Sequence, residues 1–94
     1  MRYQKAQNLV EWFLEKQVIY GKDIDYKVTN NYNSNSNTFV IHNLGAEIED
    51  GIVWFGEEDV IDFMIESVKD IDIADDIVDI KLVDGLEIVI QIVK

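Results

Sequence analysis

Hydrophobic residues repeat with two different periods in separate parts of this chain, and this separation limits the folds open to it. Residues 3–18 show the period of an amphipathic helix, and from Ile24 onward apolar and polar residues alternate as in a strand. Segregated segments of these two kinds exclude an all-helical bundle. We therefore predict an α+β fold in which two amphipathic helices pack on one face of a small antiparallel sheet, with a C-terminal β-hairpin.

The first predicted helix, residues 3–18, has one apolar stripe. Trp12 projects away from this stripe, among polar residues. Two interpretations stay open for it: another element of the domain covers the indole, or the indole is an exposed anchor for a partner. The stripe consists of Ala6, Leu9, Val10, Phe13, Leu14 and Gln17.

The second helix is predicted from Gly56 to about Lys69. Its first turn is acidic, and the positive end of the helix dipole stabilises acidic side chains at that position. Acids that recur every four residues would form a ridge on its surface, with a rise of about 6 Å per step. The ridge is Glu58, Asp62 and Glu66, and the apolar stripe is Val60, Ile61, Met64, Ile65 and Val68.

Two further predicted strands, Ile24–Thr29 and Thr38–His42, are separated by the segment Asn30–Asn37, which is rich in Asn and Ser. Such residues satisfy local backbone groups and tolerate left-handed conformations. We expect a mobile, solvent-facing loop there.

Asp-Gly occurs in two predicted hairpin turns, and the alternation of apolar residues indicates a three-residue loop in both. In the C-terminal hairpin, Gly85 would take the left-handed position, which pairs Leu82 with Leu86. The same loop length at Glu49–Gly51 would pair Ile48 with Ile52. We expect the apolar hairpin Val78–Val93 to lie at a sheet edge, where it could form a homodimer.

Charge is distributed unevenly along the 94 residues, which we expect to form a single domain spanning 1–94. Residues 1–42 hold five basic and four acidic residues, whereas residues 43–94 hold three basic and fifteen acidic ones, so the net charges are +1 and −12. A surface of this kind repels phosphate groups. We therefore expect no direct binding to nucleic acid or to an anionic membrane, and attraction to basic proteins.

Catalytic, cofactor and metal sites are not expected. The chain has no cysteine, and its one histidine, His42, lies on a predicted strand that alternates in polarity, as a structural residue would. The acidic segment from Asp70 does not fit a calcium loop, because Asp75 replaces the required glycine and Lys81 replaces the bidentate glutamate. We predict a protein that is not an enzyme and has no cofactor.

We expect a soluble, cytoplasmic protein. Met1–Asn8 contains no apolar segment typical of a signal peptide, and the longest stretch without charge, residues 28–46, is rich in Asn and Ser.

The predicted order of elements, a helix, a small sheet with an Asn/Ser-rich connection and an acidic helix, resembles the small acidic phage-encoded anti-CRISPR proteins that act as DNA mimics. The similarity covers architecture, length and charge over roughly residues 3–69 and includes no sequence motif. It implies a non-enzymatic inhibitor that occupies the DNA-binding surface of a nuclease.

Three kinds of function remain open: an acidic inhibitor of a nuclease or another nucleic-acid-binding protein, an immunity or antitoxin protein that neutralises a basic toxin, and a structural accessory domain. The inhibitor is the predicted function, with a basic protein as its partner. The predicted partner-binding residues are Glu57, Glu58, Asp59, Asp62, Glu66, Asp70, Asp72, Asp75, Asp76 and Trp12.

Overall fold

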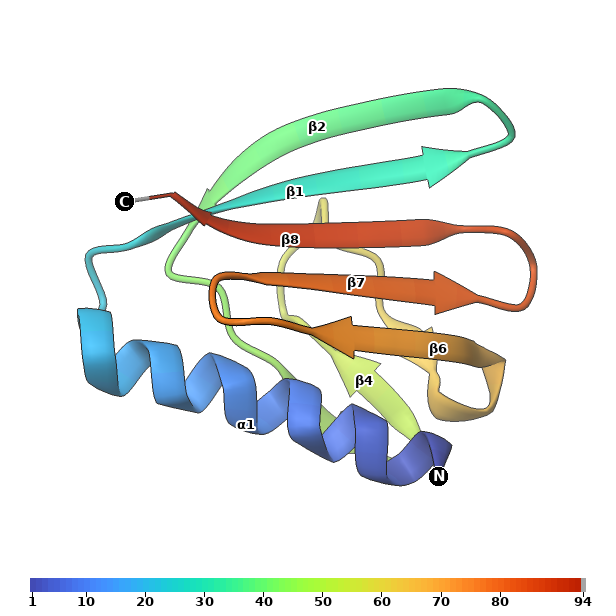
Figure 1. Cartoon of the computed structure of the whole chain (residues 1–94), viewed down its shortest axis with the longest axis horizontal. Coiled ribbons are helices and arrows are strands. Elements are labelled where there is room, and N and C mark those ends of the chain that lie inside the picture. Colours follow the sequence, from blue (N-terminus) through green and yellow to red (C-terminus); the bar gives the residue numbers. More distant parts are fainter. Residues whose placement is uncertain (94) are drawn as a thin grey trace.

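The computed structural model describes residues 1–93 and contains one α-helix and two antiparallel sheets (Figure 1). The large sheet has five strands in the order β2-β1-β8-β7-β6, and the small sheet has the order β3-β4-β5. The elements are α1 (Arg2–Tyr20), β1 (Asp25–Tyr32), β2 (Asn35–His42), β3 (Glu47–Glu49), β4 (Ile52–Trp54), β5 (Phe63–Met64), the 3-10 helix η1 (Ile65–Ser67), β6 (Val68–Ile73), β7 (Ile77–Leu82) and β8 (Glu87–Val93).

One face of the large sheet carries the core. Its strands alternate between buried apolar residues on this inner face and more polar, more exposed residues on the outer face. Helix α1 and the small sheet supply the other side of the core, where Phe13 lies between Tyr26 of the large sheet and Phe55 beside the small one, with ring centroids 5.6 and 6.1 Å apart. A helix and a second sheet therefore cover the face that two helices were predicted to cover.

The predicted second helix is wrong. The segment 56–69 contains no α-helix: an irregular loop with a turn runs to residue 62 and is followed by β5, η1 and the start of β6. Phe63 explains the difference, because it lies off the expected stripe yet is buried against Phe55, with ring centroids 6.0 Å apart. It also pairs with Val53 of β4, and the amide of Ile65 donates to the carbonyl of Gly51 at 2.8 Å.

The C-terminal hairpin has the predicted register. Val78 pairs with Ile90, and the amide of Leu82 donates to the carbonyl of Leu86 at 2.9 Å, which leaves a three-residue loop. Gly85 in this loop has φ of 99°, in the left-handed region. This part of the prediction is confirmed.

The predicted position of that hairpin at a sheet edge is wrong. β8 lies between β1 and β7, because β1 pairs along its length with β8 in a register that sets Val28 opposite Ile90 (Figure 1). The hairpin therefore offers no free strand for a homodimer. The two edges of the large sheet are β2 and β6.

The other two predicted loops, unlike that of the C-terminal hairpin, are shorter than expected. Ile48 pairs with Val53 instead of Ile52, and the turn contains only Asp50 and Gly51, with φ of 54° and 73°. Two consecutive residues with positive φ match the twist of a hairpin, and Asp-Gly is well suited to supply them.

The segment Asn30–Asn37 likewise consists of strand ends around the two-residue turn Asn33–Ser34, with φ of 48° and 70°. It is not the mobile loop that we predicted. Its polar side chains bond across the strands instead, as in the 2.8 Å contact from Ser36 Oγ to Asn31 Oδ1.

Helix α1 runs from Arg2 to Tyr20 and buries a face rotated from the predicted one. Trp12 and Lys16 are buried, whereas Leu14 from the predicted stripe is 56% exposed. In residues 1–93, no helix is long and apolar enough to cross a membrane.

Candidate functional site

The strongest concentration of charge lies in residues 47–66, which we call the acidic lobe. It comprises the small sheet, including the loop between β4 and β5, and the first two residues of η1. From residue 43 to residue 68 the sequence has no Lys or Arg, so these residues carry eight of the eleven net negative charges. The eight acids are all exposed, and they are Glu47, Glu49, Asp50, Glu57, Glu58, Asp59, Asp62 and Glu66.

The carboxylates of the acidic lobe have no ion-pair partner among the residues that the structure describes. Arg2 comes close, but its guanidinium donates to the backbone carbonyl of Glu66 at 3.2 Å and not to the carboxylate. Unpaired carboxylates at this density repel one another. The lobe therefore holds more negative charge than its own fold neutralises.

Asp62 differs from its neighbours because it supports the fold. Its Oδ1 accepts a hydrogen bond from the amide of Phe55 at 2.8 Å, which joins the two ends of the loop between β4 and β5. The ridge of Glu58, Asp62 and Glu66 does not form, since the helix that would have aligned them is absent. What the structure brings together instead is the consecutive group Glu57, Glu58 and Asp59 in the exposed loop.

The predicted acids from Asp70 to Asp76 lie elsewhere. Asp70 and Asp72 are on β6, opposite Lys81 and Asp79 on the outer face of the large sheet, whereas the lobe packs on the inner side. Asp70 forms an ion pair with Lys5, and this hydrogen bond lowers the pKa of Asp70. The single acidic face that we predicted is therefore divided between two sides of the molecule.

A pair of carboxyl groups on the outer face shares a site. The pKa of Asp79 is raised to about 6, mainly because the carboxyl group is partly buried and secondly because Glu87 lies beside it. The same contact, with a 3.0 Å hydrogen bond from Asn31 Nδ2 to Glu87 Oε1, lowers the pKa of Glu87. Oδ1 of Asp79 is buried and has no hydrogen-bond partner within residues 1–93. This half-buried pair on the outer face was not recognised from the sequence, where Asp79 and Glu87 are eight positions apart.

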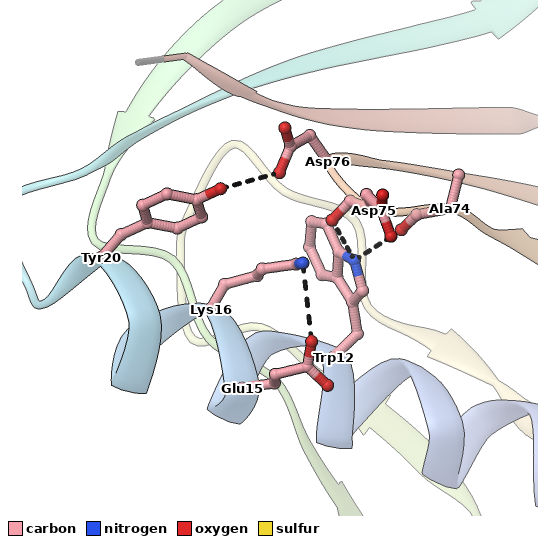
Figure 2. Close-up of polar contacts among 7 residues, drawn as sticks. All are labelled: Trp12, Glu15, Lys16, Tyr20, Ala74, Asp75 and Asp76. Atoms are coloured by element: carbon pink, nitrogen blue, oxygen red, sulfur yellow. Dashed lines mark hydrogen bonds and ion pairs between the residues drawn. The ribbon is translucent and has the colours of Figure 1, made fainter.

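Trp12 is not an exposed anchor, so that alternative is wrong. Its side chain is 5% exposed, and the indole Nε1 donates to the carbonyls of Ala74 and Asp75 at 3.0 and 3.2 Å. Figure 2 shows the indole pointing at the turn between β6 and β7, with Tyr20 reaching Asp76 of the same turn at 3.2 Å. Trp12 thus attaches α1 to the large sheet.

Lys16, one turn along α1, is also buried. Its Nζ lies 5.9 Å from the centre of the Trp12 ring and 3.6 Å from Glu15 Oε1 (Figure 2). A lysine in a helical pattern normally indicates a solvated face, so its burial was not predicted.

A groove of about 570 Å³ lies between α1 and the acidic lobe. Its walls are mainly apolar, and two of its side chains are unusually accessible: Leu14 from α1 and Trp54 from β4, the latter 42% exposed. Trp54 is held in place by a 3.2 Å hydrogen bond from Nε1 to the carbonyl of Glu49. Glu47 is the only charged residue among the described ones that line the groove. Apolar surface and uncompensated carboxylates are therefore adjacent.

His42 contacts two carboxylates at the end of β2. Its Nδ1 is 3.0 Å from Asp25 Oδ1, and its Nε2 is 3.8 Å from Asp23 Oδ1. No hydroxyl group bonds to His42 in the described part of the chain, so a Ser-His-Asp arrangement is not present there. No three metal-ligating side chains converge among residues 1–93 either.

No protein-family model, curated protein or solved structure matches this chain. The resemblance to anti-CRISPR proteins loses its architectural part with the missing acidic helix. What remains of it is the size and the acidic charge.

Proposed function

We propose that this protein binds a basic surface of another protein through the acidic lobe and thereby blocks that surface. The observation that carries the proposal is the set of eight exposed carboxylates in residues 47–66, none of which has a basic partner in the described part of the chain. A face that served only for solubility would usually intersperse Lys among its acids. The lobe has none, so its charge is available to a partner.

The groove beside the lobe supports protein binding over simple counterion binding. Stable interfaces combine an apolar centre, often with a tryptophan, with a polar rim. Leu14 and Trp54 provide accessible apolar surface, and Glu47 and Glu49 lie next to Trp54. We infer that a partner contacts Trp54 with an apolar side chain while its Lys and Arg residues pair with the lobe.

A nucleic-acid-binding protein, such as a nuclease, is the partner that this charge fits best, because its basic surface is built to receive closely spaced negative charges. In this proposal the protein acts without catalysis as an inhibitor, in the cytoplasm where such partners operate. The helical ridge of acids predicted from the sequence is not part of the proposal, because the helix is absent.

The test is capture of a partner at two salt concentrations, followed by competition. The immobilised protein is exposed to nuclease-treated host lysate at low salt, and retained proteins are eluted by raising the salt. The proposal expects a basic protein that elutes as the Debye length falls from about 10 Å to about 3 Å and that duplex DNA displaces. A retained basic protein that DNA does not displace would favour an immunity protein that neutralises a basic toxin. If no salt-sensitive partner is retained, the proposal is wrong and a structural accessory domain is the function that remains.

A further inference from the structure

The two edges of the large sheet differ in how they are protected from other strands. Edge strands expose unpaired backbone groups, and most proteins protect them with charges, bulges or covering elements. β6 has such protection: its register with β7 shifts between Val68 and Asp70, it carries Lys69 and Asp70, and Lys5 from α1 contacts it. Pairing of another strand with β6 is therefore obstructed.

β2 has none of these features. It pairs with all eight residues of β1 without a bulge, and it contains no Pro, Lys, Arg, Asp or Glu. Val40 near its middle is 58% exposed. Strand β2 lies at the upper edge of the sheet in Figure 1, away from α1. It is a long, regular and uncharged open edge.

The register shows which backbone groups are free. The amide of Asn43 donates to the carbonyl of Ile24 at 2.9 Å, and in an antiparallel pair the hydrogen-bonded positions alternate. The amides and carbonyls that face away from β1 therefore belong to every second residue of β2. These residues are Ser36, Thr38, Val40 and His42.

The charge distribution favours a second copy of this chain as the occupant of this edge. The protein carries a net charge of −11, so two copies repel each other over most of their surface. Residues 28–46 contain no charged residue of the Lys, Arg, Asp or Glu type, and β2 lies entirely inside this range. The edge is thus the place where two copies can approach with the least repulsion.

The strand is also suited to pair with itself. An antiparallel arrangement about a two-fold axis that sets Thr38 opposite Val40 of the other copy pairs all four outward residues of each strand. Side chains on the outer face then form β-branched pairs, which are favourable across strands. On the inner face, Phe39 would meet its own symmetry mate.

We propose that two copies of this chain associate through antiparallel pairing of their β2 strands, which joins two five-stranded sheets into one continuous sheet. The interface is isologous, as in most homodimers. It leaves the acidic lobe outside, so this proposal does not depend on the function proposed above. Salt separates the two: higher salt screens the repulsion and strengthens the dimer, whereas it weakens binding of a basic partner.

The test is the mass in solution of the full chain by light scattering after size exclusion, over a range of concentrations. We expect twice the monomer mass of 10.9 kDa at high concentration, with a larger dimer fraction at higher salt. Thr38→Pro removes an amide that β1 does not use and should give a monomer. The matched control Thr38→Val keeps the amide and should remain a dimer.

A second variant and a second measurement keep the test decisive if Thr38→Pro does not fold. Thr38→Lys combined with Val40→Lys places like charges opposite each other and should also give a monomer. In the wild type, the amides of Ser36, Thr38, Val40 and His42 should exchange more slowly as the concentration rises. A wild-type monomer at millimolar concentration, or a dimer in which these amides show no added protection, would overturn the proposal.

Discussion

The acids of the large sheet and those of the acidic lobe have different surroundings. On the large sheet, Asp70 pairs with Lys5, Glu87 accepts from Asn31, and Asp25 contacts His42. Among the lobe carboxylates, only that of Asp62 has a hydrogen bond to another residue within 1–93, from the Phe55 amide. The first group is used by the fold, whereas most of the second group is not. Charge that the fold does not use is the better candidate for binding.

The two tryptophans show the same contrast. Trp12 is buried and bonds to the turn between β6 and β7, whereas Trp54 is half exposed beside the groove. Net charge alone does not separate the two regions. Their neighbouring contacts do: those of Trp12 serve the stability of the fold, whereas the exposed face of Trp54 is available for the binding that we propose.

The largest expected effect is that of Trp12→Ala, which should destabilise the protein by about 3–5 kcal/mol, because it removes a buried aromatic group and its two hydrogen bonds. Urea denaturation followed by circular dichroism measures this change. Trp54→Ala is the matched substitution in the lobe, and it should change stability by less than about 1 kcal/mol while weakening partner binding. Equal losses of stability in both variants would contradict the contrast.

Gly85→Ala should destabilise the fold by about 1 kcal/mol, since φ of 99° is strained for a residue with a Cβ atom. Space is not the cause, because the nearest atom to an added Cβ is Tyr32 Cε1 at 4.0 Å. Gly45→Ala serves as the control, because Gly45 is not left-handed and its added Cβ makes an ordinary 3.5 Å contact with Gln17. Thermal unfolding of both variants decides whether the loop of the β7–β8 hairpin requires glycine.

Asp79→Asn should have the smallest effect and should depend on pH. The pKa of Asp79 is about 6 in the folded protein against 3.8 ordinarily, so between these values the folded state retains a proton that the unfolded chain releases. The stability from this proton is present below the unfolded value and is lost as the pH rises to about 6. The amide imitates the protonated acid.

The variant should therefore be more stable than the wild type at neutral pH by less than about 1 kcal/mol, with the advantage decreasing toward pH 4. Urea midpoints across this range measure it, and Asp75→Asn, on the exposed β6–β7 turn, is the control. The lowered pKa of Glu87 acts in the opposite direction, and its stability is lost only as the pH falls below the ordinary value of 4.5. An advantage that is constant with pH would show that the pKa of Asp79 is not raised in the folded protein.

The sequence predicted those parts of the fold in which local pattern and tertiary contacts agree. Alternation around Asp84 and Gly85 fixed the register of β7 and β8, and helical periodicity located α1. The prediction of a second helix was wrong because Val60, Met64 and Val68 happen to follow a helical period. The strand at Phe63 depends instead on pairing with β4, and local sequence does not encode this tertiary contact. The acidic character of the site was predicted from composition. Its division into two groups was not, because it depends on the strand order.

The most direct test of the central claim compares the partner affinity of two triple charge reversals with that of the wild type, by calorimetry at low salt. The lobe variant changes only exposed side chains and spares Asp62; it combines Glu57→Lys, Glu58→Lys and Asp59→Lys. The control variant changes the net charge by the same amount at exposed acids outside the lobe; it combines Asp23→Lys, Asp72→Lys and Asp75→Lys. We predict that the lobe variant binds about 100-fold or more weakly, with a shallower salt dependence, and that the control loses far less. Unchanged binding by the lobe variant, or equal loss in both, would contradict a binding role for the acidic lobe.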